Sequence, residues 1–99
     1  MIELGKLLER LEYSCEAGDM DVLVGAVRYD TREIEPGDLF VCIKGNRADS
    51  HDLIGEIVSR GAKVIVAERT VRVPAGITVI QVSDSRYGCR LYRAYAGSR

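Results

Sequence analysis

The polar residues best suited to binding a ligand lie in two short segments on either side of an apolar run. The first segment, Tyr29–Arg32, supplies a phenol, a carboxylate, a hydroxyl and a guanidinium in sequence. The second follows the apolar run at 39–43 and contains Gly45, which lets a ligand approach the backbone because it has no Cβ. The candidate ligand-binding residues suggested by this chemistry are Thr31, Arg32, Gly45, Asn46, Arg47 and Ala48.

The chemistry of these residues suits a nucleotide. Free backbone N–H groups after Gly45 could donate to carbonyls or phosphates, and the Asn46 amide both donates and accepts, as the edge of a pyrimidine base requires. Arg32 and Arg47 could pair with phosphate, since a guanidinium presents two parallel donors. Thr31 adds a hydroxyl to the same group.

The same segments also have a purely structural interpretation. Asp30 and Arg32 could form an ion pair within one turn, and Asp49 could cap the helix that follows. The only histidine, His51, falls in the first turn of that helix and could be a surface or capping residue. The residues by themselves leave both interpretations open.

Several classes of function are disfavoured. No GxSxG, HExxH or GxxxxGK[ST] motif occurs, and Cys15, Cys42 and Cys89 fit no zinc-ligand spacing. The formal net charge of −1 argues against a general nucleic-acid-binding protein. No apolar run approaches the roughly 18–20 residues that span a bilayer. We expect a cytoplasmic protein that binds neither nucleic acid nor membrane and holds no metal.

An α/β fold is predicted to position the two segments. The apolar runs predicted to form strands are 23–29, 38–44, 63–68 and 77–82. Glu35-Pro36-Gly37-Asp38 has the chemistry of a turn, and residues 13–21 are expected to form a connecting loop. The prediction is therefore one small domain with a mixed sheet of about four strands.

Three helices are expected to pack on this sheet. Leucines recur at helical spacing within 2–12, a second pattern covers 50–60 with Gly61 as its C-cap, and a last helix follows residue 85. The helix at 50–60 joins two strands, so it should form a βαβ unit with a right-handed crossover. Ligands in such sheets bind at the carboxyl ends of the strands, which is where both polar segments begin.

As an ordered set, these segments resemble the N-terminal domain of the Mur ligases. The set comprises Asp30-Thr31-Arg32, PGDLFV at 36–41, Gly45, DSHD at 49–52 and GAKVIVAE at 61–68, and the resemblance covers essentially the whole chain. Within the family, the leucine-rich start and VCIKG at 41–45 are most similar to the ligases that add the third residue of the peptidoglycan stem peptide. The ligases that add D-alanyl-D-alanine are the alternative.

The resemblance implies that residues 1–99 are the first of three domains, the one that binds the UDP part of UDP-N-acetylmuramoyl-dipeptide. The other two domains would bind ATP with Mg²⁺ and the incoming lysine or diaminopimelate. On this reading the chain alone holds no cofactor, is inactive, and is a monomer that docks on its own central and C-terminal domains. A free-standing module that binds a nucleotide or a protein is the competing hypothesis.

The resemblance also implies roles for individual positions. The hydroxyl residue of the family's D-S-R motif corresponds to Thr31, and the residue that flanks the uridine corresponds to Tyr29. The loop that meets the uracil and ribose corresponds to Gly45, Asn46, Arg47 and Ala48. The family often has glycine where this chain has Ser50, which weakens the assignment of its neighbours. The second-tier candidates are Asp30, Arg32, Asp49 and His51.

Overall fold

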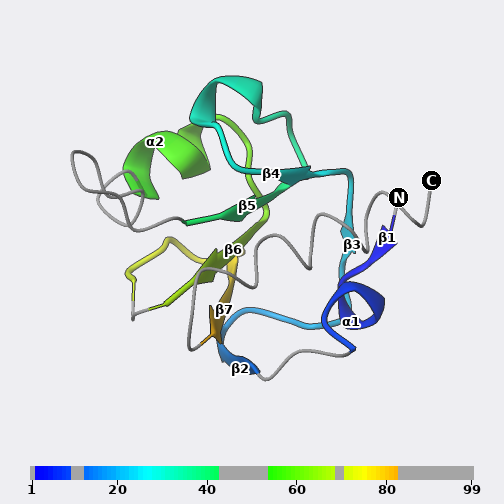
Figure 1. Ribbon diagram of the computed structural model, residues 1–99. Coiled ribbons are helices and arrows are strands. Elements are labelled where there is room, and N and C mark those ends of the chain that lie inside the picture. The colour runs from blue at the N-terminus through cyan, green and yellow to red at the C-terminus, as the bar shows by residue number, and fades with distance from the viewer. Residues whose placement is uncertain (1, 10–12, 43–53, 69–70, 83–99) are drawn as a thin grey trace.

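A five-stranded mixed sheet, in the order β2-β7-β6-β5-β4, forms the centre of the molecule (Figure 1). The computed structural model describes residues 2–9, 13–42, 54–68 and 71–82. The strands are β2 (Tyr13–Ala17), β4 (Val27–Arg28), β5 (Leu39–Val41), β6 (Val64–Ala67) and β7 (Thr78–Val82). Strands β4 to β7 are parallel neighbours, whereas β2 runs antiparallel to β7. The predicted α/β class and mixed sheet are confirmed, with one strand more than expected.

The central strands β5 and β6 are buried on both faces, as their continuous apolar runs predict. Because side chains alternate between the faces of a strand, the core divides into two clusters. Leu39, Val41, Val64 and Val66 belong to the first apolar cluster, together with Leu4, Leu7, Leu8, Val24, Val27, Ile80 and Val82. Phe40, Cys42, Ile65 and Ala67 belong to the second apolar cluster, together with Ile34, Ile57 and Ala62.

Helix α2 (Ile54–Ser59) joins β5 to β6 and buries Ile57 in the second apolar cluster. Two hydrogen bonds close its end, from Gly61 N–H to the Val58 carbonyl (3.0 Å) and from Ala62 N–H to the Ile57 carbonyl (3.3 Å). This is a Schellman motif, and Gly61 adopts the positive φ of +106° that the motif requires. The predicted βαβ unit and C-cap are confirmed, while residues 50–53 of the predicted helix lie outside the described residues.

The predicted N-terminal helix is shorter than expected. Ile2–Glu3 forms strand β1, which pairs antiparallel with β3 (Leu23–Val24), and helix α1 spans only Leu4–Leu7. The leucine stripe is nevertheless buried at Leu4, Leu7 and Leu8 against the face of the sheet opposite α2. The first residues pair as a strand because β3 offers a free edge, which the helical spacing does not reveal.

The prediction of a loop over residues 13–21 is wrong for its first part, because strand β2 lies there. Its side chains are mostly exposed, so the sequence shows no apolar alternation, and the strand is held by backbone pairing with β7. Thr78 holds the chain in place just after β2. Its hydroxyl donates to the Asp19 carbonyl (2.9 Å) and accepts from the Asp19 N–H (3.1 Å).

The strand predicted at 23–29 is interrupted at Gly25, which separates β3 from β4. Gly25 donates its N–H to the Gly37 carbonyl (3.0 Å), and a Cβ at this position would lie 2.9 Å from Asp38 Oδ1. A larger residue at this position would therefore have to displace the Asp38 carboxylate. The predicted last helix falls at 83–99, outside the described residues, and no helix in the described part of the chain is long and apolar enough to cross a membrane.

Candidate functional site

The candidate site lies where the parallel strands β4 and β5 end side by side. The register pairs Val27 with Leu39 and Arg28 with Phe40, so the chain leaves both strands at one edge of the sheet. Tyr29, Asp30, Thr31 and Arg32 follow β4 at this edge. Four of the ten predicted site residues thus follow a strand at this edge, and their role in binding stays a prediction. The other predicted residues, Gly45, Asn46, Arg47, Ala48, Asp49 and His51, lie outside the described residues, so their positions stay predictions.

The segment after β4 forms a short 3₁₀ helix, η1 (Thr31–Glu33), which is the uppermost helix in Figure 1. Asp30 is its N-cap and accepts a hydrogen bond from the Arg32 N–H at 2.9 Å. Tyr29 is partly buried against the first apolar cluster, and Thr31 is also half-buried. Local capping thus places the Thr31 hydroxyl at the start of a tight turn beside a well-packed tyrosine.

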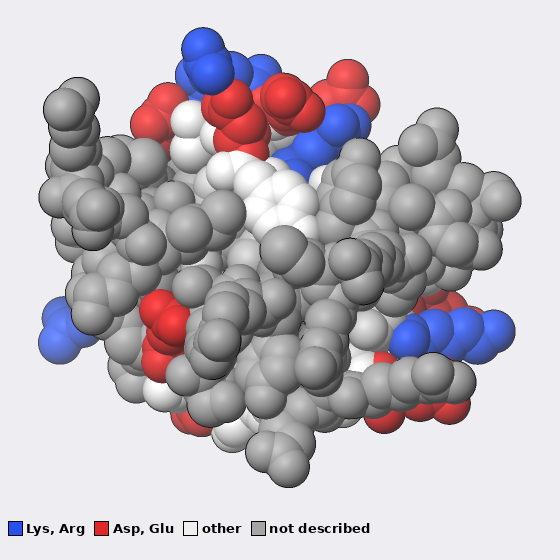
Figure 2. All heavy atoms as spheres, viewed as in Figure 1, with Lys and Arg blue, Asp and Glu red and all other residues white. Residues whose placement is uncertain are grey.

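The structural interpretation of Asp30 and Arg32 is confirmed. The Arg32 guanidinium donates to the Asp30 carboxylate from Nη2 (2.7 Å) and from Nε (3.1 and 3.2 Å). The Arg32 side chain remains 82% exposed, so this pair contributes little to stability. Figure 2 shows charged side chains of both signs gathered at the top of the molecule, where Figure 1 places η1.

The pair sets the ionisation of Asp30. The side-chain hydrogen bond from Arg32, aided by its backbone N–H, lowers the pKa of Asp30 from 3.8 to about 2, and the same contact raises the pKa of Arg32. Because the folded-state pKa of Asp30 is depressed, its stabilising contribution is complete above pH 3.8 and is lost as the pH falls towards 2.

We expect Arg32→Gln to raise the pKa of Asp30 from about 2 towards 3.8, without reaching it because the backbone N–H bond remains. A carboxyl ¹³C titration by NMR measures this. Arg60→Gln is the control, since Arg60 acts on Asp30 only through a weaker charge interaction. A pKa that stays at about 2 in Arg32→Gln would contradict the assignment.

Sequence reasoning missed one important residue, the buried Asp38, which lies directly before β5. Its side chain is only 4% exposed, and Oδ2 accepts hydrogen bonds from Arg28 Nε at 2.9 Å and from the Glu35 N–H at 3.0 Å. The turn at 35–38 is confirmed: Asp38 N–H donates to the Glu35 carbonyl (3.1 Å), and Gly37 has a φ of +90°. The sequence signal for this residue is an aspartate directly before an apolar strand. A carboxylate buried at such a position needs hydrogen-bond partners from elsewhere in the fold.

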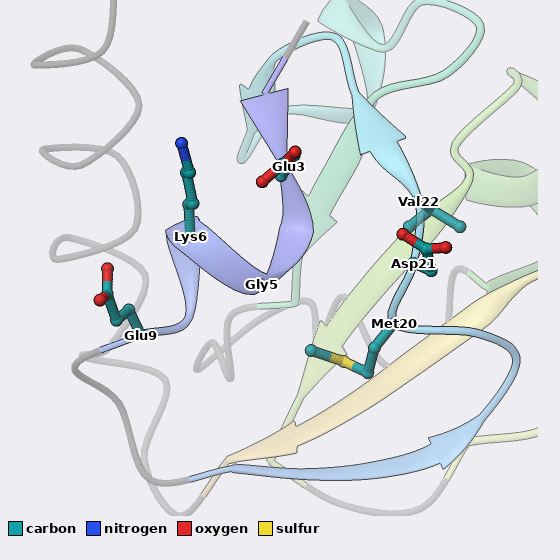
Figure 3. Close-up of a pocket in the computed structure, with 7 residues that line it drawn as sticks. All are labelled: Glu3, Gly5, Lys6, Glu9, Met20, Asp21 and Val22. Carbon is teal, nitrogen blue, oxygen red and sulfur yellow. The ribbon is translucent and has the colours of Figure 1, made fainter.

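A separate surface pocket of about 390 Å³ lies on the side of α1 (Figure 3). Figure 3 shows side chains from β1, α1 and Glu9 on one side and from the segment leading into β3 on the other. The lining residues are Glu3, Gly5, Lys6, Glu9, Met20, Asp21 and Val22. None of them is a predicted site residue, and carboxylates outnumber the single lysine, so this pocket does not suit a phosphate-bearing ligand.

The family resemblance implies ATP and Mg²⁺ for a longer protein, bound by domains other than this one. The described part of the chain contains no group of three or more histidine, cysteine, aspartate or glutamate residues placed to hold a metal ion. The sequence also lacks a GxxxxGK[ST] phosphate loop.

Comparison with known sequences gives one family. Residues 24–90 match the family described as "Mur ligase family, catalytic domain". The UDP-N-acetylmuramoyl-L-alanyl-D-glutamate–2,6-diaminopimelate ligase of Clostridium perfringens is 42% identical over 83 residues, which is 84% of this chain and 17% of that protein. The ligase of the same name from Geobacillus thermodenitrificans is 40% identical over 87 residues, with shares of 86% and 17%.

Solved structures with this fold include MurF from Acinetobacter baumannii, with a TM-score of 0.76 and 26% identity over 93% of this chain and 21% of that chain. MurF ligase from Thermotoga maritima, solved with ADP, has a TM-score of 0.53 and 35% identity over 61% of this chain and 14% of its own. The chain therefore spans about a fifth of the length of these proteins.

Proposed function

Since the chain belongs to the Mur ligase family, we propose that it binds the UDP part of UDP-N-acetylmuramoyl-dipeptide as the first domain of a longer ligase. That ligase would use ATP and Mg²⁺ to add the third residue of the peptidoglycan stem peptide. The names of the relatives favour diaminopimelate as the added residue. The chain itself would supply nucleotide binding and no catalytic residue.

One observation carries this proposal: the parallel pairing of β4 and β5. It sets the segment Tyr29–Arg32 beside the point where the chain leaves β5. The first polar segment and the end of β5, from which the chain continues towards the second polar segment, therefore lie at one edge of the sheet. Ligands of open α/β sheets bind at this edge.

The chemistry of this edge supports a uridine nucleotide. Thr31 is half-buried and offers a hydroxyl, and the partly buried Tyr29 supplies an aromatic surface against which a base could pack. We propose that Gly45, Asn46, Arg47 and Ala48 complete the site, with backbone and amide groups meeting the uracil and ribose. Asp30, Arg32, Asp49 and His51 are second-tier candidates, because Arg32 already pairs with Asp30.

We propose that the central and C-terminal domains of the longer ligase bind ATP with Mg²⁺ and the amino acid, and that the whole protein acts in the cytoplasm as a monomer. The chain alone is then inactive. It should also bind UDP-sugar weakly, because the contacts made by the other domains are missing.

Addition of D-alanyl-D-alanine is a second candidate reaction, favoured by the likeness to MurF structures. The 42% identity to a diaminopimelate ligase outweighs the 26% identity to MurF from Acinetobacter baumannii. Assaying the complete gene product with labelled diaminopimelate and with D-alanyl-D-alanine would separate the two reactions.

We expect a titration with UDP to shift the amide resonances of Tyr29, Thr31 and residues 45–48, while ATP with Mg²⁺ leaves them unchanged. Thr31→Ala should weaken UDP binding by about 0.5–1.5 kcal/mol, the usual contribution of one hydrogen bond. Thr31→Ser is the matched control, because it keeps the hydroxyl and should bind like the wild type.

A titration at millimolar UDP that shifts none of these resonances would contradict the proposal. Equal weakening in Thr31→Ala and Thr31→Ser would show that the hydroxyl is not the binding group.

A further inference from the structure

We propose that the ion pair between Arg28 and the buried Asp38 is the positioning element of the UDP site. It would hold the segment 29–33 in the conformation that presents Thr31, without touching the ligand. This inference rests on the proposed function, since it names what orients that site.

Asp38 is a fixed point of the fold. Its residue is 3% exposed, and its backbone is tied to the start of β6 through its carbonyl, which accepts from the Lys63 N–H at 2.8 Å. Its carboxylate also accepts from the Glu35 N–H at 3.0 Å and lies beside Gly25. Contacts from several separate segments therefore fix the position of this negative charge.

Arg28 links the Asp38 carboxylate to the segment that carries Thr31. It is the last residue of β4, directly before Tyr29, and its Nε donates to Asp38 Oδ2 at 2.9 Å. Its Nη1 lies 3.7 Å from Glu33 Oε2, at the end of η1. The Arg28 guanidinium thus contacts Asp38 at the start of β5 and Glu33 at the end of η1. The backbone of Arg28 leads directly into the segment that carries Thr31.

Two ion pairs that involve residues of β4 and η1 differ in burial, and the more buried pair is the one that we assign to positioning the site. Asp30 and Arg32 pair within η1 at the surface, where water screens the interaction. The Arg28 side chain is only 28% exposed and that of Asp38 only 4%. Removing one partner there leaves a poorly hydrated charge, so the conformation of the segment depends on this pair.

The test compares Arg28→Gln and Asp38→Asn with the matched controls Arg72→Gln and Asp21→Asn, which are exposed residues that belong to neither β4 nor η1. Affinity for UDP is measured by amide titration of the 99-residue chain at a temperature where each variant is shown to be folded. If the binding conformation falls to roughly a fifth of the population, the apparent Kd rises about fivefold. The controls should keep the wild-type Kd.

Two further readouts separate positioning from general stability. In the free protein, Arg28→Gln should shift the amide resonances of residues 30–33 and leave those of β6 unchanged. The double variant Arg28→Gln/Asp38→Asn should bind UDP no more weakly than either single variant, because both remove one coupled interaction. If Asp38→Asn does not fold, Arg28→Gln still tests the proposal. Arg28 is partly exposed, so we expect this variant to fold.

The outcomes are distinguishable. If wild-type chain binds UDP at residues 29–31 and both variants bind with unchanged Kd while folded, the positioning role is overturned and the proposed function stands. If the wild-type chain fails to bind UDP at all, the proposed function fails and this inference fails with it.

Discussion

Gly61→Ala is expected to lower the free energy of unfolding by about 2–5 kcal/mol. The positive φ of +106° costs an alanine about 1–2 kcal/mol. The new Cβ would also lie 2.7 Å from Pro36 Cα, so backbone must shift, at a cost of about 1–3 kcal/mol. The shift would strain the hydrogen bond from Gly37 N–H to the Gly61 carbonyl (2.9 Å), which joins the turn before β5 to the end of α2.

Urea denaturation measures this loss, and Gly76→Ala is the matched control. Gly76 has a similar φ of +92°, but a Cβ there meets nothing within 4 Å. It should therefore lose only the conformational part, about 1–2 kcal/mol. Equal losses of unfolding free energy in the two variants would mean that the contact with Pro36 adds nothing to the cost of Gly61→Ala.

Phe40→Ala is expected to cost about 3–5 kcal/mol, the usual range for removing a buried phenylalanine. Phe40 is 1% exposed in the middle of β5 and packs in the second apolar cluster with Ile57 and Ile65. The cavity would open beneath the strand that precedes the proposed ligand loop. The loss is a large part of the roughly 5–15 kcal/mol that stabilises a typical domain.

The measurement is again urea denaturation, with Leu23→Ala as the control because Leu23 is a large apolar residue that is 45% exposed. Leu23→Ala should change stability by no more than about 0.5 kcal/mol. Phe40→Leu, which leaves a smaller cavity, gives an intermediate value if Phe40→Ala is largely unfolded. A loss in Phe40→Ala no greater than that in Leu23→Ala would contradict the packing described for β5.

The candidate site could be predicted from the sequence only in its position along the chain. Tyr29–Arg32 follows β4, as expected, because a strand followed by polar residues and a turn is a local pattern. The ion pair of Asp30 with Arg32 is local too, since the residues are two apart, and it was one of the two interpretations left open. The role of Asp38 was not visible, because its partners Arg28 and Glu35 are brought to it by the fold.

The parts of the fold that the sequence by itself determined are those with local causes. The apolar runs of β5 and β6, the leucine stripe of α1, the Pro36-Gly37 turn and the glycine that ends α2 each follow from residues that are close in sequence. Side-chain burial and backbone conformation at these places depend on residue type, so the local residue pattern is enough to predict them.

Only the tertiary structure decided which segments pair. Strand β2 joins the sheet through the backbone groups of residues that are mostly exposed, and its partner β7 lies at the other end of the chain. At Gly25, where the strand is interrupted, the Asp38 carboxylate lies where a Cβ would be crowded, and the two residues are 13 apart in the sequence. Backbone hydrogen bonding is the same for every residue type, so long-range pairing leaves no trace in the residue pattern, and only the assembled sheet shows it.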